Sequence, residues 1–104
     1  MLTLPIKKKW FDMIKSGEKK EEYREIKPYY DSRFLIYYDR DLFTGKLMQM
    51  SAPDEIILRN GYSSNSPTIK CKVKIEKGYG KPEWGAEPNK KYFILKILSV
   101  EEVN

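Results

Sequence analysis

The sequence predicts an α+β protein, a small mixed β-barrel of about five to six strands with two or more helices. Three observations indicate this fold class. The chain has 104 residues, which suits a single domain spanning residues 1–104. Several segments have the apolar and polar patterns of strands, and at least two suit helices. These segments lack the regular strand and helix alternation of a doubly wound parallel sheet.

The first predicted elements are a short strand and a helix. Residues 2–6 suit a strand in which Pro5 lies at an edge or at the end, because proline has no backbone donor. Over residues 7–16, three large apolar side chains fall on one helix face, which we expect in the core: Trp10, Phe11 and Ile14. Gly17 then predicts a left-handed helix end.

The next segment predicts a strand followed by a second helix. Residues 20–26 suit a strand with Glu22 and Arg24 on one face and Tyr23 on the other. Pro28 suits the first turn of a helix. Two aromatic side chains of this helix are expected to point inward: Tyr30 and Phe34.

Residues 35–53 have no clear periodicity. Residues 39–41 and 44–45 have the composition of loops or turns. Leu47 and Met50 are expected to contact the core.

The remaining sequence predicts three strands. The first covers residues 54–59, and a polar connection over residues 60–67 follows it. In residues 68–77 apolar and polar residues alternate, with Ile69, Cys71, Val73 and Ile75 facing inward and Lys70, Lys72, Lys74 and Glu76 forming a solvated face. Residues 78–89 form a long connection, a length typical of binding loops. Residues 92–100 are apolar on both faces, as in a central strand.

Composition excludes several classes of function. The chain has no histidine, which excludes Ser-His and Cys-His catalysis and histidine-ligated zinc. Its one cysteine, Cys71, cannot form an internal disulfide and is expected to be a buried thiol. We expect no metal and no cofactor. The net charge of +5 favours polyanionic partners. With neither a membrane span nor a signal peptide in its pattern, the protein is expected to be a cytoplasmic monomer.

The segment from Gly17 to Arg24, Gly-Glu-Lys-Lys-Glu-Glu-Tyr-Arg, resembles the signature of the ASCH family, within the PUA-like group. This signature combines a glycine, a lysine two residues later, a polar residue and an arginine, between the first helix and a strand. Four further features fit the same resemblance: residues 4–7, the helix with Trp10 and Phe11, residues 59–62 and residues 80–85. The resemblance covers nearly the whole chain and is nearest to small bacterial and phage members.

The resemblance implies a module that binds RNA or a nucleotide in a charged cleft beside residues 17–24. In such a cleft Lys19 would supply a mobile charge, Arg24 a planar fork for phosphate or a base edge, and Glu22 an acceptor. Five further residues are expected around the rim, where exposed rings would stack on bases: Arg59, Tyr62, Tyr79, Lys81 and Trp84.

Two alternatives remain for the same segment. Some small family members are amidohydrolases that deacylate modified cytidine, using a lysine, a threonine three residues later and a distant glutamate. Here the threonine position holds Glu22, so an amidohydrolase or ribonuclease would use Lys19, Glu22 and Glu83 differently. The second alternative is a structural ion pair between Glu22 and Arg24 or Lys19.

Overall fold

The computed structural model describes residues 1–34, 37–40, 42–45 and 47–103, with the backbone alone for residues 37–40 and 47–51. The elements follow in the order β1 (Thr3–Ile6), α1 (Lys8–Ser16), β2 (Glu21–Glu25), α2 (Pro28–Phe34), β3 (Tyr37–Arg40), β4 (Leu47–Ser51), β5 (Glu55–Asn60), β6 (Thr68–Tyr79), the short 3₁₀ helix η1 (Pro82–Trp84) and β7 (Lys91–Glu102).

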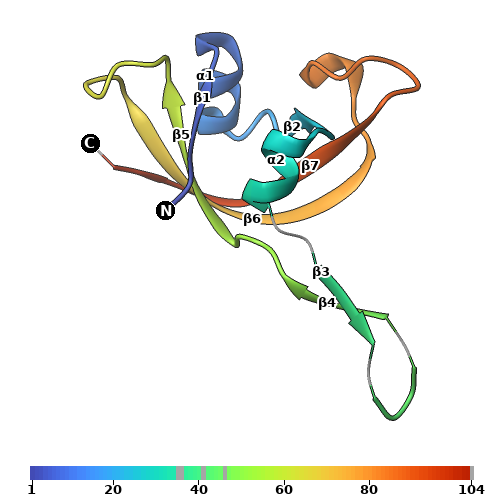
Figure 1. Ribbon diagram of the computed structural model, residues 1–104. Helices are drawn as coiled ribbons and strands as arrows, with labels where there is room; N and C mark the ends of the chain where they lie inside the picture. Colours follow the sequence, from blue (N-terminus) through green and yellow to red (C-terminus); the bar gives the residue numbers. More distant parts are fainter. Residues whose placement is uncertain (35–36, 41, 46, 104) are drawn as a thin grey trace.

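A mixed sheet of five strands, in the order β1-β5-β6-β7-β2, forms the body of the protein. β1 is parallel to β5, and the other neighbouring strands are antiparallel. Both helices lie over one face of this curved sheet (Figure 1). The predicted α+β class is therefore confirmed. The predicted barrel is not supported, because β1 and β2 are the two edges of the described sheet and do not pair.

The first helix ends where the sequence predicts and begins one residue later, at Lys8. Phe11 and Ile14 are buried against the sheet, and Gly17 has a φ of 88°. This left-handed conformation costs glycine little, and it lets the Gly17 N–H donate to the Ile14 carbonyl at 3.1 Å. The chain can then reverse into β2 within a few residues.

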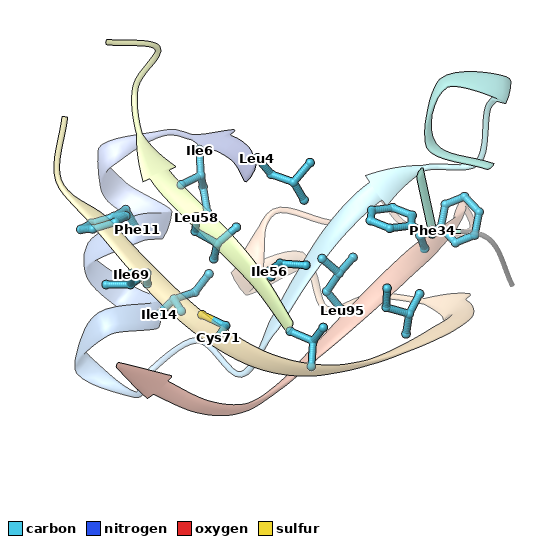
Figure 2. Packing of buried hydrophobic residues seen from close by; sticks show 13 residues of the cluster. Leu4, Ile6, Phe11, Ile14, Phe34, Ile56, Leu58, Ile69, Cys71 and Leu95 are labelled. Atoms are coloured by element: carbon cyan, nitrogen blue, oxygen red, sulfur yellow. The ribbon is translucent and has the colours of Figure 1, made fainter. Parts of the chain in front are cut away.

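Alternation along β6 produces the centre of the core (Figure 2). The side chains of Ile69, Cys71, Val73 and Ile75 are buried, as predicted, while Lys72 and Lys74 are exposed. The first half of β7 is buried on both faces, as predicted for an inner strand: Tyr92, Phe93, Ile94 and Leu95. The prediction is wrong for its second half, where Leu98 is 66% exposed. Phe34 of α2 packs edge-on against Phe93, with 5.0 Å between ring centroids.

The segment that lacked periodicity forms a hairpin of β3 and β4, a separate sheet that projects away from the body (Figure 1). The predicted loop at residues 39–41 is wrong for Asp39 and Arg40, which lie in β3, while Asp41 lies outside the described residues. The predicted turn at residues 44–45 is confirmed, since Thr44 lies in a turn and Gly45 has a φ of 70°. The predicted core contacts of Leu47 and Met50 lie outside the described side chains.

No helix in the described part of the chain is long and apolar enough to cross a membrane. Within the same residues, no group of three or more cysteine, aspartate or glutamate side chains is placed to hold a metal ion.

Candidate functional site

A cleft of about 500 Å³ lies between the two edges of the sheet. Residues 5–8 from the end of β1 and the start of α1 form one wall, and residues 22–25 of β2 form the other. The start of α2, the end of β5 with the turn after it, and the end of η1 complete the lining with these residues: Lys27, Tyr30, Asn60, Gly61, Tyr62, Trp84 and Gly85. The remaining lining residues are Trp10 and Tyr92. Ligand sites of small proteins commonly have this volume.

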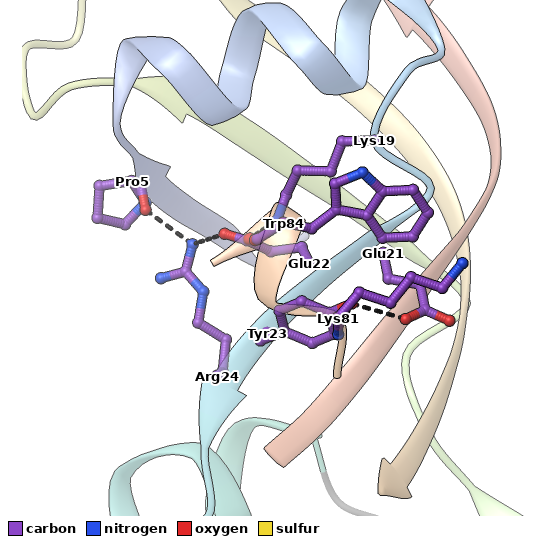
Figure 3. A network of polar contacts seen from close by, with 8 residues as sticks. All are labelled: Pro5, Lys19, Glu21, Glu22, Tyr23, Arg24, Lys81 and Trp84. Carbon is purple, nitrogen blue, oxygen red and sulfur yellow. Dashed lines mark hydrogen bonds and ion pairs between the residues drawn. The ribbon is translucent and has the colours of Figure 1, made fainter. Parts of the chain in front are cut away.

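Arg24 connects the two sheet edges through its side chain. Its Nη2 donates to the Pro5 carbonyl of β1 at 2.9 Å and to Glu22 Oε2 at 2.9 Å (Figure 3). Its Nη1 donates to the hydroxyl of Tyr30 at 3.3 Å. The cleft therefore occupies the place where a closed barrel would have a backbone ladder between β1 and β2.

Lys19 lies beneath the cleft and is buried. Its side chain is 0% exposed, and its Nζ donates to the Trp84 carbonyl at 2.7 Å and lies 3.0 Å from Glu22 Oε1. The rings of Trp10 and Tyr23 lie 4.8 and 5.0 Å from the same nitrogen, close enough for cation–π attraction. The prediction of a mobile charge at the turn is wrong, because these groups fix the ammonium inside the protein.

Glu22 is held between two cations. One carboxylate oxygen contacts Lys19 and the other contacts Arg24, and the side chain is 8% exposed. Burial lowers the pKa of Lys19, and the charge of Glu22 opposes that shift. Two cations share one carboxylate here, so the network carries an excess of positive charge beside the cleft when Lys19 is protonated. The predicted structural ion pair is thus present, and it forms part of the cleft wall.

The loop over residues 80–90 packs closely on β2. The Tyr23 hydroxyl donates to Glu21 Oε1 at 2.7 Å and accepts the Lys81 N–H at 2.9 Å. Burial raises the pKa of Tyr23, so this hydroxyl keeps its proton at neutral pH. A Cβ on Gly80 would lie 2.6 Å from the Tyr23 ring. This contact needs glycine, and it fixes the loop that presents Trp84.

Four of the predicted site residues line the cleft: Glu22, Arg24, Tyr62 and Trp84. Tyr62 is 89% exposed at the rim, whereas Trp84 is half-buried and its ring lies 4.5 Å from Lys81 Nζ. Trp10, predicted as a core residue, packs against the core and also lines the cleft.

The structure does not bring the other predicted residues into the lining. Tyr79, predicted in a loop, belongs to β6, so the long connection begins at residue 80. Arg59 lies in β5, between Pro5 of β1 and Thr68 of β6. Lys81 lies beside Trp84 at the margin, and Glu83 is exposed outside the cleft.

Sequence reasoning missed several residues of the cleft: Lys7, Lys8, Lys27, Tyr30 and Asn60. The lysines lie in a strongly charged sequence, where an individual lysine carries no distinguishing signal. The one usable signal was the start of α1. Its first turn contains no acidic residue, and the side chain of its N-cap, Lys7, makes no capping hydrogen bond. Helices usually have acidic residues in the first turn and a capping side chain at this end.

Comparison with protein-family models, with curated proteins and with solved structures finds no match to this chain. Its function is therefore inferred from the geometry and charge of the cleft.

Proposed function

We propose that the protein binds RNA or a nucleotide, and that the cleft between β1 and β2 holds one base of that ligand. The observation that carries the proposal is the combination of aromatic rings with an excess of cations in one cleft of nucleotide size. Aromatic rings stack on bases, and arginine and lysine attract phosphate. The resemblance of residues 17–24 to the ASCH signature supports the same proposal.

The buried network gives the cleft a preformed wall. Arg24 is held by the Pro5 carbonyl, by Glu22 and by Tyr30, so little side-chain entropy is lost when a ligand binds. Its Nε is buried and has no acceptor among the described residues, which leaves Nη1 as the donor nearer to a ligand. A guanidinium fixed in this way is suited to recognise a carbonyl edge or an oxyanion.

The same contacts favour binding over hydrolysis. Both oxygens of Glu22 already accept from cations, so each has less acceptor capacity left for an attacking water. Glu83, the distant carboxylate of the hydrolase alternative, lies outside the cleft lining. Lys19 is buried behind the wall, where a substrate carbonyl does not reach it.

Titration of the labelled protein with mononucleotides and short RNA oligomers at low salt tests the proposal. We expect ligand-dependent shifts of the amide resonances of residues 22–25, 60–62 and 84–85. Unchanged resonances at millimolar ligand would rule the proposal out. Turnover of acylated cytidines or RNA by the wild type, lost in a Lys19→Ala variant that circular dichroism shows to be folded, would instead support the hydrolase.

Tyr62 and Tyr79 offer a matched pair of variants. Both rings are largely exposed, at 89% and 63%, but only Tyr62 lines the cleft. We expect Tyr62→Ala to weaken nucleotide binding by about 1 kcal/mol or more, since base stacking contributes roughly 1–3 kcal/mol. Tyr79→Ala should leave the affinity unchanged. Equal losses in both variants would contradict stacking in the cleft.

A further inference from the structure

We propose that the ligand carries a terminal phosphate, and that the lysines where β1 meets α1 bind it. This inference rests on the proposed function and names the ligand class more closely: a nucleoside monophosphate, either free or as the phosphorylated end of an RNA. Lys7 and Lys8 line the cleft at this junction, and Lys27 lines it at the start of α2.

The charge that remains unneutralised at the cleft is positive. Both lining carboxylates are already engaged by cations: Glu22 by Lys19 and Arg24, and Glu25 by Lys27 at 3.9 Å and Lys90 at 3.4 Å. Lys7, by contrast, has no ion-pair partner in the part of the chain that the structure describes. A carboxylate-poor, lysine-rich margin favours an anionic group over a neutral one.

The start of α1 adds to this preference. The end of a helix where backbone N–H groups are unpaired carries partial positive charge, and acidic residues there are stabilising. In this protein Lys7, Lys8 and Lys9 occupy that end, and the first turn holds no acidic residue. Only Lys8 pairs with a carboxylate of the helix, that of the exposed Asp12 one turn later. A phosphate would be attracted by the lysines and by the helix end together.

The stacking surface lies directly beside these lysines. Ile6 of β1 pairs in register with Asn60 of β5, and the Gly61 N–H donates to the Ile6 carbonyl at 3.3 Å. Lys7 and Tyr62 therefore extend from neighbouring backbone segments into one cleft. This juxtaposition suits a ligand whose base and phosphate belong to the same nucleotide. A phosphate monoester carries about −1.5 to −2 charges at neutral pH, which is more than an internal phosphodiester carries.

Calorimetric titration of the full chain with each nucleoside and its monophosphates tests the inference. We expect the monophosphate to bind about tenfold more tightly than its nucleoside at low salt, and this difference to shrink as salt is added. Equal affinity of the two ligands would overturn the phosphate inference and leave base binding intact. If neither ligand binds, the proposed function itself fails.

A double substitution locates the phosphate. Lys7→Gln/Lys8→Gln should abolish most of the gain in affinity that the phosphate provides. The matched control is Lys72→Gln/Lys74→Gln, which removes the same charge from the exposed face of β6. We expect this control to retain nearly all of the gain. Equal losses in the two double variants would assign the effect to net charge and overturn the site.

Short RNA oligomers distinguish the two sources of the phosphate. If a phosphorylated oligomer binds more tightly than its hydroxyl-ended form, the RNA end is a ligand. If the phosphate increases affinity only in the free monophosphate, the ligand is the free nucleotide. Both of these results support the inference. It is overturned if hydroxyl-ended oligomers bind as tightly as phosphorylated oligomers and monophosphates.

Discussion

Lys19 shows how one buried charge can organise a site. Its ammonium lies between the Trp84 carbonyl, the Glu22 carboxylate and two aromatic rings, and its side chain is 0% exposed. Burying a charge costs free energy that only several well-placed partners offset. The partners come from α1, β2 and the loop after β6, so this residue joins three segments that are distant in sequence.

Replacement of Lys19 by methionine should destabilise the protein. The substitution keeps much of the side-chain volume but leaves Glu22 with Arg24 alone, and breaking a buried pair costs about 3–5 kcal/mol. Urea denaturation measures the change in the free energy of unfolding. Lys20→Met is the control, since Lys20 is exposed, and we expect a change within about 0.5 kcal/mol. Equal stability of both variants would show that the network contributes little.

Cys71 should be unreactive in the folded protein. Burial raises the pKa of its thiol to about 11, so about one molecule in a thousand holds a thiolate at pH 8. A thiol reagent at pH 8 should modify Cys71 only after urea unfolds the chain, as followed by mass spectrometry. Rapid modification of the folded protein would contradict its burial.

The same pKa shift predicts the direction in which the stability of the fold changes at alkaline pH. The folded-state pKa of Cys71 lies above the ordinary value of 9.0, so the folded state keeps its proton longer than the unfolded state. Its contribution to stability is complete below about pH 9 and falls as the pH rises from 9 to 11. Cys71→Ala should reduce this fall in urea titrations between those values. An unchanged pH dependence would contradict the shift.

The loop after β6 depends on a close approach to β2. A Cβ on Gly80 would lie 2.6 Å from the Tyr23 ring and 2.7 Å from the Ala86 Cβ. We expect Gly80→Ala to destabilise the protein by about 1–3 kcal/mol through overpacking. It should also weaken ligand binding, because the same loop presents Trp84.

Gly78→Ala is the matched control for this element. Its added Cβ would lie 3.3 Å from Ile94 Cδ1, the flexible end of a side chain that can shift. Thermal unfolding of both variants, together with nucleotide titration, separates the two positions. A larger loss in Gly78→Ala than in Gly80→Ala would refute the close contact with Tyr23.

Across the whole molecule, the open sheet and the projecting hairpin are separate features. β3 and β4 pair only with each other in the described sheets, and Tyr37 pairs in register with Ser51 at the base. Paired positions of neighbouring strands lie about 5 Å apart, so a short turn can replace residues 37–51. We expect such a replacement to leave a cooperative thermal unfolding transition and the cleft intact. A loss of folding would show that the hairpin stabilises the body.

The candidate site was predictable in part from the sequence. Gly17, Glu22 and Arg24 were identified because a helix end and a strand follow from neighbouring residues. The positions of Lys7 and Asn60 in the same cleft were not predicted, since they depend on β1 pairing with β5 across some fifty residues of sequence. Local composition does not determine which distant strands become neighbours.

The sequence alone determined most elements of the body and their faces, but not the β3–β4 hairpin. The alternation in β6, the apolar face of α1 and the left-handed turn at Gly17 each follow from residues a few positions apart, and the structure confirms all three. Only the tertiary structure decided that the sheet stays open, that Lys19 is buried and that the cleft lies between the sheet edges. The physical reason is that closure, burial and cleft formation depend on strand order and sheet curvature, which arise from contacts between distant segments.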